Sequence, residues 1–99
     1  MTLRVVLRPA AEDEVRDAYD WYEQRRAGLG GEFLACVEEA LHRIARMSEA
    51  PAPVHRDVRR VLLRRFPHAV FYVIESDAIV VLAVFHGRRD AAQWQKRRP

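Results

Sequence analysis

The sequence is poor in several residue types, and each scarcity excludes a class of structure or site. Its single cysteine, Cys36, excludes an internal disulfide and lies among apolar helix positions, as is typical of a structural thiol in a reducing compartment. No apolar run approaches the roughly 20 residues of a membrane span. The opening "MTLRVVLRPAAEDE" has too short an apolar run for a signal peptide. We therefore expect a soluble, cytoplasmic protein with no membrane contact.

Ligands for metals and phosphates are also scarce. The spacing of the histidines gathers no three of them locally, and Cys36 has no companion, so we predict no metal site. The segment "GLGG" at 28–31 lacks the lysine and the preceding strand of a phosphate-binding loop, and we interpret its glycines as a turn. We expect no cofactor. The four histidines are His42, His55, His68 and His86.

Lysine is almost absent, whereas arginine is abundant and unevenly placed. Residues 1–54 hold seven arginines and ten acidic residues, and residues 55–99 hold nine arginines, the one lysine and four acidic residues. The net charge of +3 therefore conceals a negative first half and a positive second half. The positive half suits a polyanion or an acidic protein surface as a partner.

The first half of the chain has the periodicity of helices. A β-branched run at 3–8 predicts a strand that leads into them. Apolar residues at helical spacing predict two amphipathic helices, from Pro9 to about Arg26 and from Gly31 to Ser48. The glycines of "AGLGGEF" predict a tight reversal between the helices. The proline-rich "SEAPAPV" that follows predicts a loop.

The second half has the composition of strands. "VRRVLLRRF", "AVFYVI" and "AIVVLAVF" predict three sequential antiparallel strands, and the absence of polar residues from 78–85 indicates a buried, central one. A short helix is predicted from Asp90. Residues 1–99 therefore predict one α+β domain, in which a helical hairpin packs on a mostly antiparallel sheet in the order strand, helix, helix and three strands.

Four arginines lie in the first of these three strands. Alternation places Arg60 and Arg64 on one face of the strand and Arg59 and Arg65 on the other. The pair that faces away from the helices would form a positive stripe able to bind nucleic acid or an acidic protein segment. In the alternative interpretation the strand is solvated and its arginines pair with acidic residues such as Glu75 or Asp90.

The segment "FHGRRDAAQW" at 85–94 has some of the chemistry of a ribonuclease. Metal-free cleavage of RNA needs a base, an acid and cations for the phosphate. The residues that would supply these groups are His86, Arg88 and Arg89. Because the sequence shows no second acid or base nearby, we favour an alternative in which His86 caps the sheet edge and an arginine pairs with Asp90. The aromatic residues Trp21, Tyr22 and Trp94 are expected to pack at the core or its boundary.

Three segments together resemble a known family. "WYEQRRAGLGGEFL", "RRVLLRRFPHAVFYVI" and "VLAVFHGRRDAAQW" resemble the ParE branch of the RelE/ParE superfamily of bacterial toxins, from Pro9 to Arg97. The chain departs from the family at Ala91, where proline is frequent. The resemblance implies two helices on an antiparallel sheet and a ParD-type antitoxin whose disordered acidic tail folds on the toxin. We assign that contact to Arg59, Arg60, Arg64 and Arg65.

The activities of this superfamily diverge. RelE-like members cut messenger RNA on the ribosome, usually with a C-terminal tyrosine, whereas ParE-like members poison DNA gyrase. Trp94 stands about where the tyrosine is expected, so the resemblance favours gyrase inhibition by binding, with no sequence-specific DNA binding by the toxin alone. The target contact is assigned to Arg88, Arg89, Trp94, Lys96 and Arg97. The alternatives are an mRNA endonuclease that uses His86, Arg88 and Arg89, and a non-toxic module that only binds its antitoxin.

Overall fold

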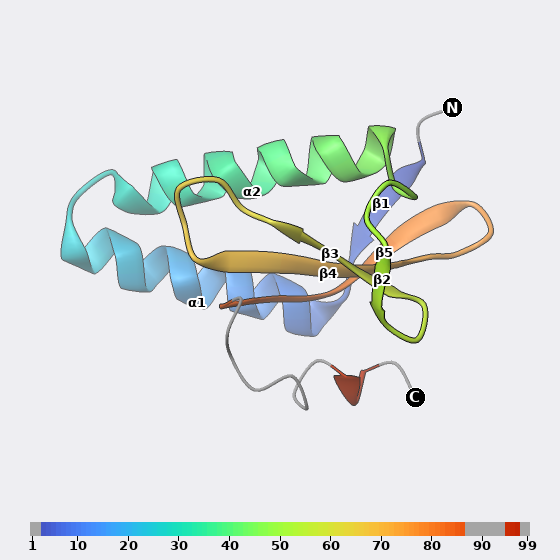
Figure 1. The fold of residues 1–99 in the computed structure, drawn as a ribbon. Coiled ribbons are helices and arrows are strands. Elements are labelled where there is room, and N and C mark those ends of the chain that lie inside the picture. The colour runs from blue at the N-terminus through green and yellow to red at the C-terminus, as the bar shows by residue number, and fades with distance from the viewer. Residues whose placement is uncertain (1–2, 87–94, 98–99) are drawn as a thin grey trace.

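Two helices cover one face of a five-stranded sheet in the computed structural model, which describes residues 3–86 and 95–97 (Figure 1). This is the predicted α+β fold, with the helical hairpin after the first strand. The predicted helix from Asp90 begins outside the described residues. In chain order the elements are β1 (Arg4–Leu7), α1 (Pro9–Arg25), α2 (Leu29–Arg46), β2 (Pro53–His55), β3 (Val58–Leu62), β4 (His68–Ile74) and β5 (Ala78–His86).

The strand order is β1-β5-β4-β3-β2. As predicted, β3, β4 and β5 are sequential antiparallel strands, and β5 is an internal strand between β1 and β4. β1 pairs with β5 in parallel, which is possible because the helices supply the long connection that a parallel pair requires. β2 corrects the sequence analysis, which expected only a loop there. Its one proline, Pro53, is tolerated because β2 lies at the sheet edge and need not donate on its outer side.

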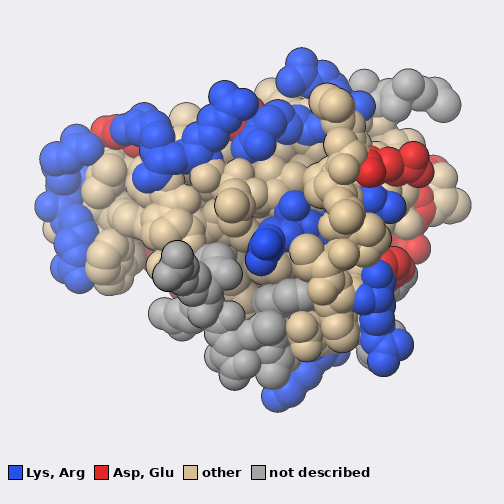
Figure 2. All heavy atoms as spheres, viewed as in Figure 1, with Lys and Arg blue, Asp and Glu red and all other residues tan. Residues whose placement is uncertain are grey.

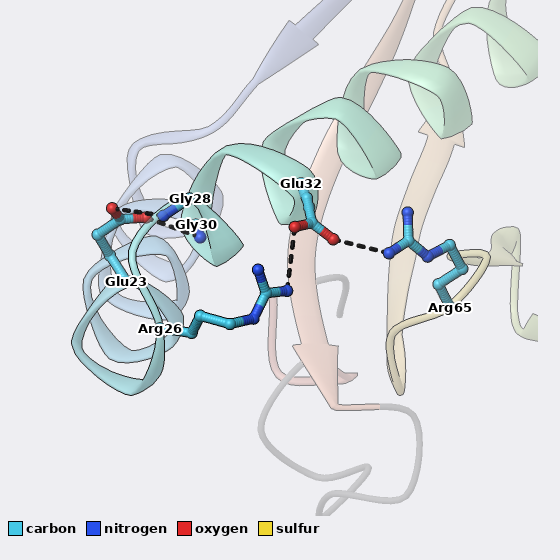
Figure 3. Close-up of polar contacts among 6 residues, drawn as sticks. All are labelled: Glu23, Arg26, Gly28, Gly30, Glu32 and Arg65. Carbon is cyan, nitrogen blue, oxygen red and sulfur yellow. Dashed lines mark hydrogen bonds and ion pairs between the residues drawn. The ribbon is translucent and has the colours of Figure 1, made fainter.

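One carboxylate holds the connection between the helices. Gly28 has a φ of 91°, in the left-handed region that glycine adopts without strain, and directly precedes α2. Glu23 Oε2 accepts a hydrogen bond of 2.9 Å from the Gly28 N–H, and Oε1 accepts one of 2.9 Å from the Gly30 N–H (Figure 3). The first N–H groups of a helix have no intrahelical partner, so Glu23 caps α2 from the preceding helix. α2 consequently begins at Leu29, earlier than the predicted Gly31.

Apolar side chains fill both faces of the sheet. On the helix side, α2 buries Phe33, Val37, Ala40 and Ile44, which recur at i, i+4, i+7 and i+11. Alternation along the strands produces a second buried cluster on the other face, formed by Val58, Ala69, Phe71, Val73, Leu82 and Ala83. Within the described ranges, no helix is both long enough and apolar enough to cross a bilayer.

Candidate functional site

One face of α1 carries the polar and aromatic side chains that approach the end of β5. Glu14, Asp17, Ala18 and Trp21 recur at i, i+3, i+4 and i+7, which places them on one side of the helix. α1 packs across β5, and β1 pairs with β5 only as far as Val81. The C-terminal half of β5 therefore has α1, instead of a neighbouring strand, along this edge.

A shift in strand register brings two histidines together. Counting outward from Ile74 opposite Ile79, an unbroken ladder would place His68 opposite Phe85. An irregularity within the β4–β5 ladder shifts the register by one residue, so His68 lies opposite His86 and their ring centroids are 6.0 Å apart. Bulges of this kind change the direction in which side chains point. The sequence analysis found no second acid or base near His86, and the structure corrects this by placing His68 beside it.

These side chains line a cavity of about 370 Å³ between α1 and the strands, which we call the α1–β5 cavity. Its size lies near the lower end of the range for small-ligand sites, roughly 300–1,000 Å³. Its walls combine two carboxylates with five aromatic or imidazole rings. α1 contributes Glu14, Asp17, Ala18, Trp21 and Tyr22, and the strands contribute His68, Val84, Phe85 and His86.

Four of the rings form a continuous series along the cavity. Trp21 meets Tyr22 edge-on with ring centroids 5.1 Å apart, and Tyr22 meets His68 at 5.8 Å. Burial raises the pKa of the Tyr22 hydroxyl above its usual 10.0, so Tyr22 is neutral near pH 7. Trp21 instead is 51% exposed, and the guanidinium of Arg25 lies 4.0 Å from its ring centroid. Trp21 is therefore available at the rim of the cavity, and His86 completes the series beyond His68.

Glu14 anchors the C-terminal segment at one end of the cavity. The Glu14 and Arg97 side chains are only 16% and 26% exposed, and Arg97 Nη2 lies 2.8 Å from Glu14 Oε2. Glu14 Oε1 also accepts a hydrogen bond of 2.9 Å from the Val84 N–H, and Arg97 Nη1 donates one of 3.0 Å to the Leu82 carbonyl. The pair thus satisfies backbone groups of β5 that β1 does not reach. Arg97, predicted to contact the target, is bound within the fold.

The predicted positive stripe on the sheet does not form. β3 ends at Leu62, and Arg65 has a φ of 72°, so Arg64 and Arg65 lie in the β3–β4 turn and no longer alternate with the strand. Arg59 faces the helix side. It donates to the carbonyl oxygens of the loop after α2, at Glu49 and Pro51. Of the four arginines, Arg60 alone is exposed on the face away from the helices.

Glu32 of α2 joins the helical connection to the β3–β4 turn. Its Oε2 lies 3.0 Å from Arg26 Nη2 and its Oε1 lies 2.7 Å from Arg65 Nη2 (Figure 3). These hydrogen bonds, first that of Arg26 and then that of Arg65, lower the pKa of the Glu32 carboxyl below its usual 4.5. The alternative interpretation of the sequence, in which arginines pair with carboxylates, is thus correct in kind, although the partners come from α2.

Glu39 of α2 binds a second pair of arginines. Arg43 Nε lies 2.7 Å from its carboxylate and Arg64 Nε lies 3.8 Å from it. The side chains of Arg26, Arg64 and Arg65 nevertheless remain 60%, 70% and 65% exposed. Figure 2 shows basic side chains, here all arginines, along the edge that α2 forms and at the α1–α2 connection. We call Arg26, Arg43, Arg64 and Arg65 the α2 basic edge.

Several predicted site residues cannot be placed. Lys96 is exposed, whereas Arg88, Arg89 and Trp94 lie outside the described residues. Across residues 3–86 and 95–97, no three His, Cys, Asp or Glu side chains come together as metal ligands.

The sequence analysis did not single out Glu14 and Asp17. Their i, i+3 spacing beside the apolar face of α1 was a usable signal. Counting residues outward from the "ESDA" turn on both strands would have placed His68 near the end of β5. The one-residue register shift that sets it opposite His86 could not be predicted from the sequence.

Comparison with known proteins identifies the family. The family model described as the ParE toxin of type II toxin-antitoxin systems, parDE, matches residues 5–91. The chain belongs to the ParE toxin family. It is 30% identical over 88 residues to Toxin ParE2 of Mycobacterium tuberculosis, in strain CDC 1551 / Oshkosh and in strain ATCC 25618 / H37Rv. That match covers 88% of this chain and 84% of the relative. The chain is thus a toxin of a type II toxin-antitoxin system.

Solved structures of ParE-like and RelE-like systems share the fold of this ParE-family toxin. A structure titled "Chromosomal ParDE TA system from P. aeruginosa" superposes with a TM-score of 0.65 at 14% identity, covering 86% of this chain and 96% of the other. The toxin-antitoxin complex RelBE2 from Mycobacterium tuberculosis superposes with a TM-score of 0.62 at 18% identity, covering 87% and 99%. At these identities the likeness defines the fold, which ParE and RelE systems share, and leaves the target open.

Proposed function

We propose that this ParE-family toxin arrests growth in the cytoplasm by binding and inhibiting DNA gyrase, and that a ParD-type antitoxin neutralises it. The observation that carries the proposal is the family match, which runs along residues 5–91 and is to ParE toxins. Binding to a protein target requires no catalytic group, only a surface complementary to that target. An antitoxin that covers the same surface would neutralise the toxin.

The surroundings of His86 support binding over catalysis. The described walls of the α1–β5 cavity carry two carboxylates. Glu14 is neutralised by Arg97, whereas Asp17 forms no ion pair with a described residue and repels the phosphates of RNA. Two described cations beside the cavity are already engaged, since Arg97 is bound to Glu14 and Arg25 stacks on Trp21. A phosphodiester at His86 therefore meets an unfavourable local field within the described part of the site.

A supercoiling assay tests the proposal. Purified toxin is added to DNA gyrase and relaxed plasmid, with and without a molar excess of the antitoxin. We expect loss of supercoiling that the antitoxin restores. Full supercoiling at stoichiometric excess of the toxin would reject gyrase as the target. Expression of the toxin alone decides a simpler question, since a harmless product would identify a module that only binds its antitoxin.

The second candidate function is metal-independent cleavage of mRNA, and one observation favours it. His68 lies beside His86, so the cavity holds two imidazoles, one of which is able to act as the base and the other as the acid for transfer from a 2′-hydroxyl. The similarity in fold to a RelBE complex is compatible with this reaction.

Primer extension on cellular RNA after induction tests the second candidate. An endonuclease would produce discrete cuts that His68→Ala and His86→Ala both remove. His42→Ala is the matched control, because His42 is exposed on α2 outside the cavity. Transcripts that stay intact during growth arrest would reject the endonuclease.

A further inference from the structure

The α1–β5 cavity has two walls on which the chain itself already binds arginine. At one end, the Glu14 carboxylate holds Arg97 at two points, with nitrogen–oxygen distances of 2.8 Å and 3.2 Å. At the other end, the guanidinium of Arg25 lies 4.0 Å from the centroid of the Trp21 ring. Carboxylates and indole rings are the two kinds of group that best bind a guanidinium in proteins. The cavity walls therefore match arginine in both respects.

Asp17 lies between these two ends on the same face of α1. It is three residues beyond Glu14 and four before Trp21. Its charge interacts with the neighbouring Arg16, whose direct ion pair is with Asp13, and the Asp17 carboxylate itself forms no hydrogen bond or ion pair with a described residue. Arg97 balances the charge of Glu14, so among the described residues Asp17 is the carboxylate of the cavity wall that has no direct ion-pair partner. Within the described part of the site, the cavity thus presents one carboxylate without a direct ion pair beside a series of rings.

We propose that the α1–β5 cavity receives an arginine side chain of a protein partner, with Asp17 as its counter-ion and the exposed Trp21 as its stacking surface. The volume of about 370 Å³ suits one side chain, not an extended polymer. A nucleic acid is the less favoured ligand because its phosphates would approach the Asp17 carboxylate. This inference goes beyond the proposed function and does not depend on gyrase being the target.

Nuclear magnetic resonance with small probes tests the chemistry of the site. N-acetyl-arginine amide is titrated into the ¹⁵N-labelled full chain, and N-acetyl-citrulline amide, a neutral analogue of the same shape, is the control probe. We expect saturable shifts confined to the cavity residues, including the Trp21 indole N–H, for the arginine probe. Citrulline that binds equally well would overturn the assignment, as would preferential binding of guanosine 3′-monophosphate.

A matched pair of variants tests the role of Asp17. Asp17→Asn is expected to weaken binding of the arginine probe roughly two- to fivefold, the range for an exposed ion pair. Asp20→Asn is the control, because Asp20 is exposed on α1, makes no ion pair with the described residues and does not line the cavity. Both carboxylates lie on the helix surface, so neither variant should unfold the protein. Equal affinities of the two variants would overturn the proposal.

The same two variants test whether the partner is a protein. Growth arrest on induction and rescue by the antitoxin are measured for Asp17→Asn and Asp20→Asn. We expect Asp17→Asn alone to change one of the two readouts, according to whether the arginine comes from the target or from the antitoxin. Unchanged arrest and unchanged rescue would overturn the partner assignment. Inhibition of gyrase by the unsubstituted toxin is a separate measurement. The proposed function can therefore be rejected while this inference still holds.

Discussion

Of the three glycines in the described part of the chain, Gly30 leaves the least room for an added methyl group. A Cβ there would lie 2.8 Å from two ring carbons of Tyr19 and 2.9 Å from Glu23 Oε1, the oxygen that caps α2. Gly31 is a matched control, since nothing lies within 4 Å of its added Cβ. We predict that Gly30→Ala has a free energy of unfolding about 1–3 kcal/mol lower than Gly31→Ala, the usual cost of overpacking. Urea denaturation measures the difference, and equal stabilities would contradict the packing described.

The ion pairs of Glu32 predict that the free energy of unfolding depends on pH. Arg26 and Arg65 lower the pKa of this carboxyl below its usual 4.5, so its contribution to stability is fully present above 4.5 and is lost as pH falls through the lowered value. We predict that Glu32→Gln is less stable than the unsubstituted protein at pH 7 and that the difference disappears in acid. Glu38→Gln, an exposed substitution on the same helix, is the control. A stability difference that stays constant with pH would contradict this account.

Contacts of single residues were the least predictable feature of the sequence. Tyr22 and Phe33 were placed correctly because both lie on apolar stripes at helical spacing. The positions of Arg64 and Arg65 were wrong because the strand pattern continues in the sequence beyond Leu62, where the backbone turns. The partners of the arginines come from α2, far away in the chain, and alternation along a strand carries no information about them.

Among the elements, the C-terminal segment and β5 depend on one partly buried ion pair. Glu14 and Arg97 bond each other and the backbone of Val84 and Leu82, so removing either partner leaves polar groups of β5 unsatisfied. We predict a coupling free energy of about 1–3 kcal/mol in a double-mutant cycle of Glu14→Ala and Arg97→Ala.

The Asp13–Arg16 pair of α1 is the control for that cycle. Its side chains are 66% and 64% exposed, so solvent screens the pair and its coupling should be much smaller. Equal coupling in the two cycles would show that the Glu14–Arg97 contact does not hold the C-terminal segment.

Most elements, but not their pairing, followed from the sequence. Helical spacing and β-branched runs predicted the helices and four of the five strands, because these patterns reflect burial of one face or of both. β2 was missed because Pro53 within it and Pro51 before it mask the strand pattern, and because its pairing comes from β3. His68 beside His86 was missed because a one-residue register shift has no signature in a single sequence.

At the scale of the whole molecule, basic side chains gather along one edge of the face that Figure 2 shows. Arginines lie along the α2 basic edge, where Glu32 and Glu39 pair with them, and further acidic side chains lie near the β4–β5 turn. We propose this edge as the surface for an acidic antitoxin tail. It keeps Arg64 and Arg65 of the predicted stripe, whereas Arg59 is bound to a loop and Arg60 lies on the face away from the helices. The charge of the sequence predicted that this surface is positive. Its location on the molecule became apparent only from the fold.

The α2 basic edge predicts how the antitoxin binds. We expect Arg65→Glu to weaken antitoxin binding roughly tenfold at low salt, because charge reversal replaces attraction with repulsion. The effect should shrink as salt rises. Arg16→Glu on α1 is the control, since Arg16 is similarly exposed but lies outside this edge. Affinity measured by calorimetry at two salt concentrations checks the prediction, and equal losses for both variants would place the antitoxin elsewhere.

The central claim is that this toxin acts by binding gyrase and not by cutting RNA. The most direct test is gyrase supercoiling with the His68→Ala, His86→Ala double variant beside the unsubstituted toxin at equal concentration. Our account predicts that both proteins inhibit supercoiling and that the antitoxin relieves both. It would be contradicted if the unsubstituted toxin left supercoiling intact while transcripts were cut, and if the double variant abolished both the cuts and the growth arrest.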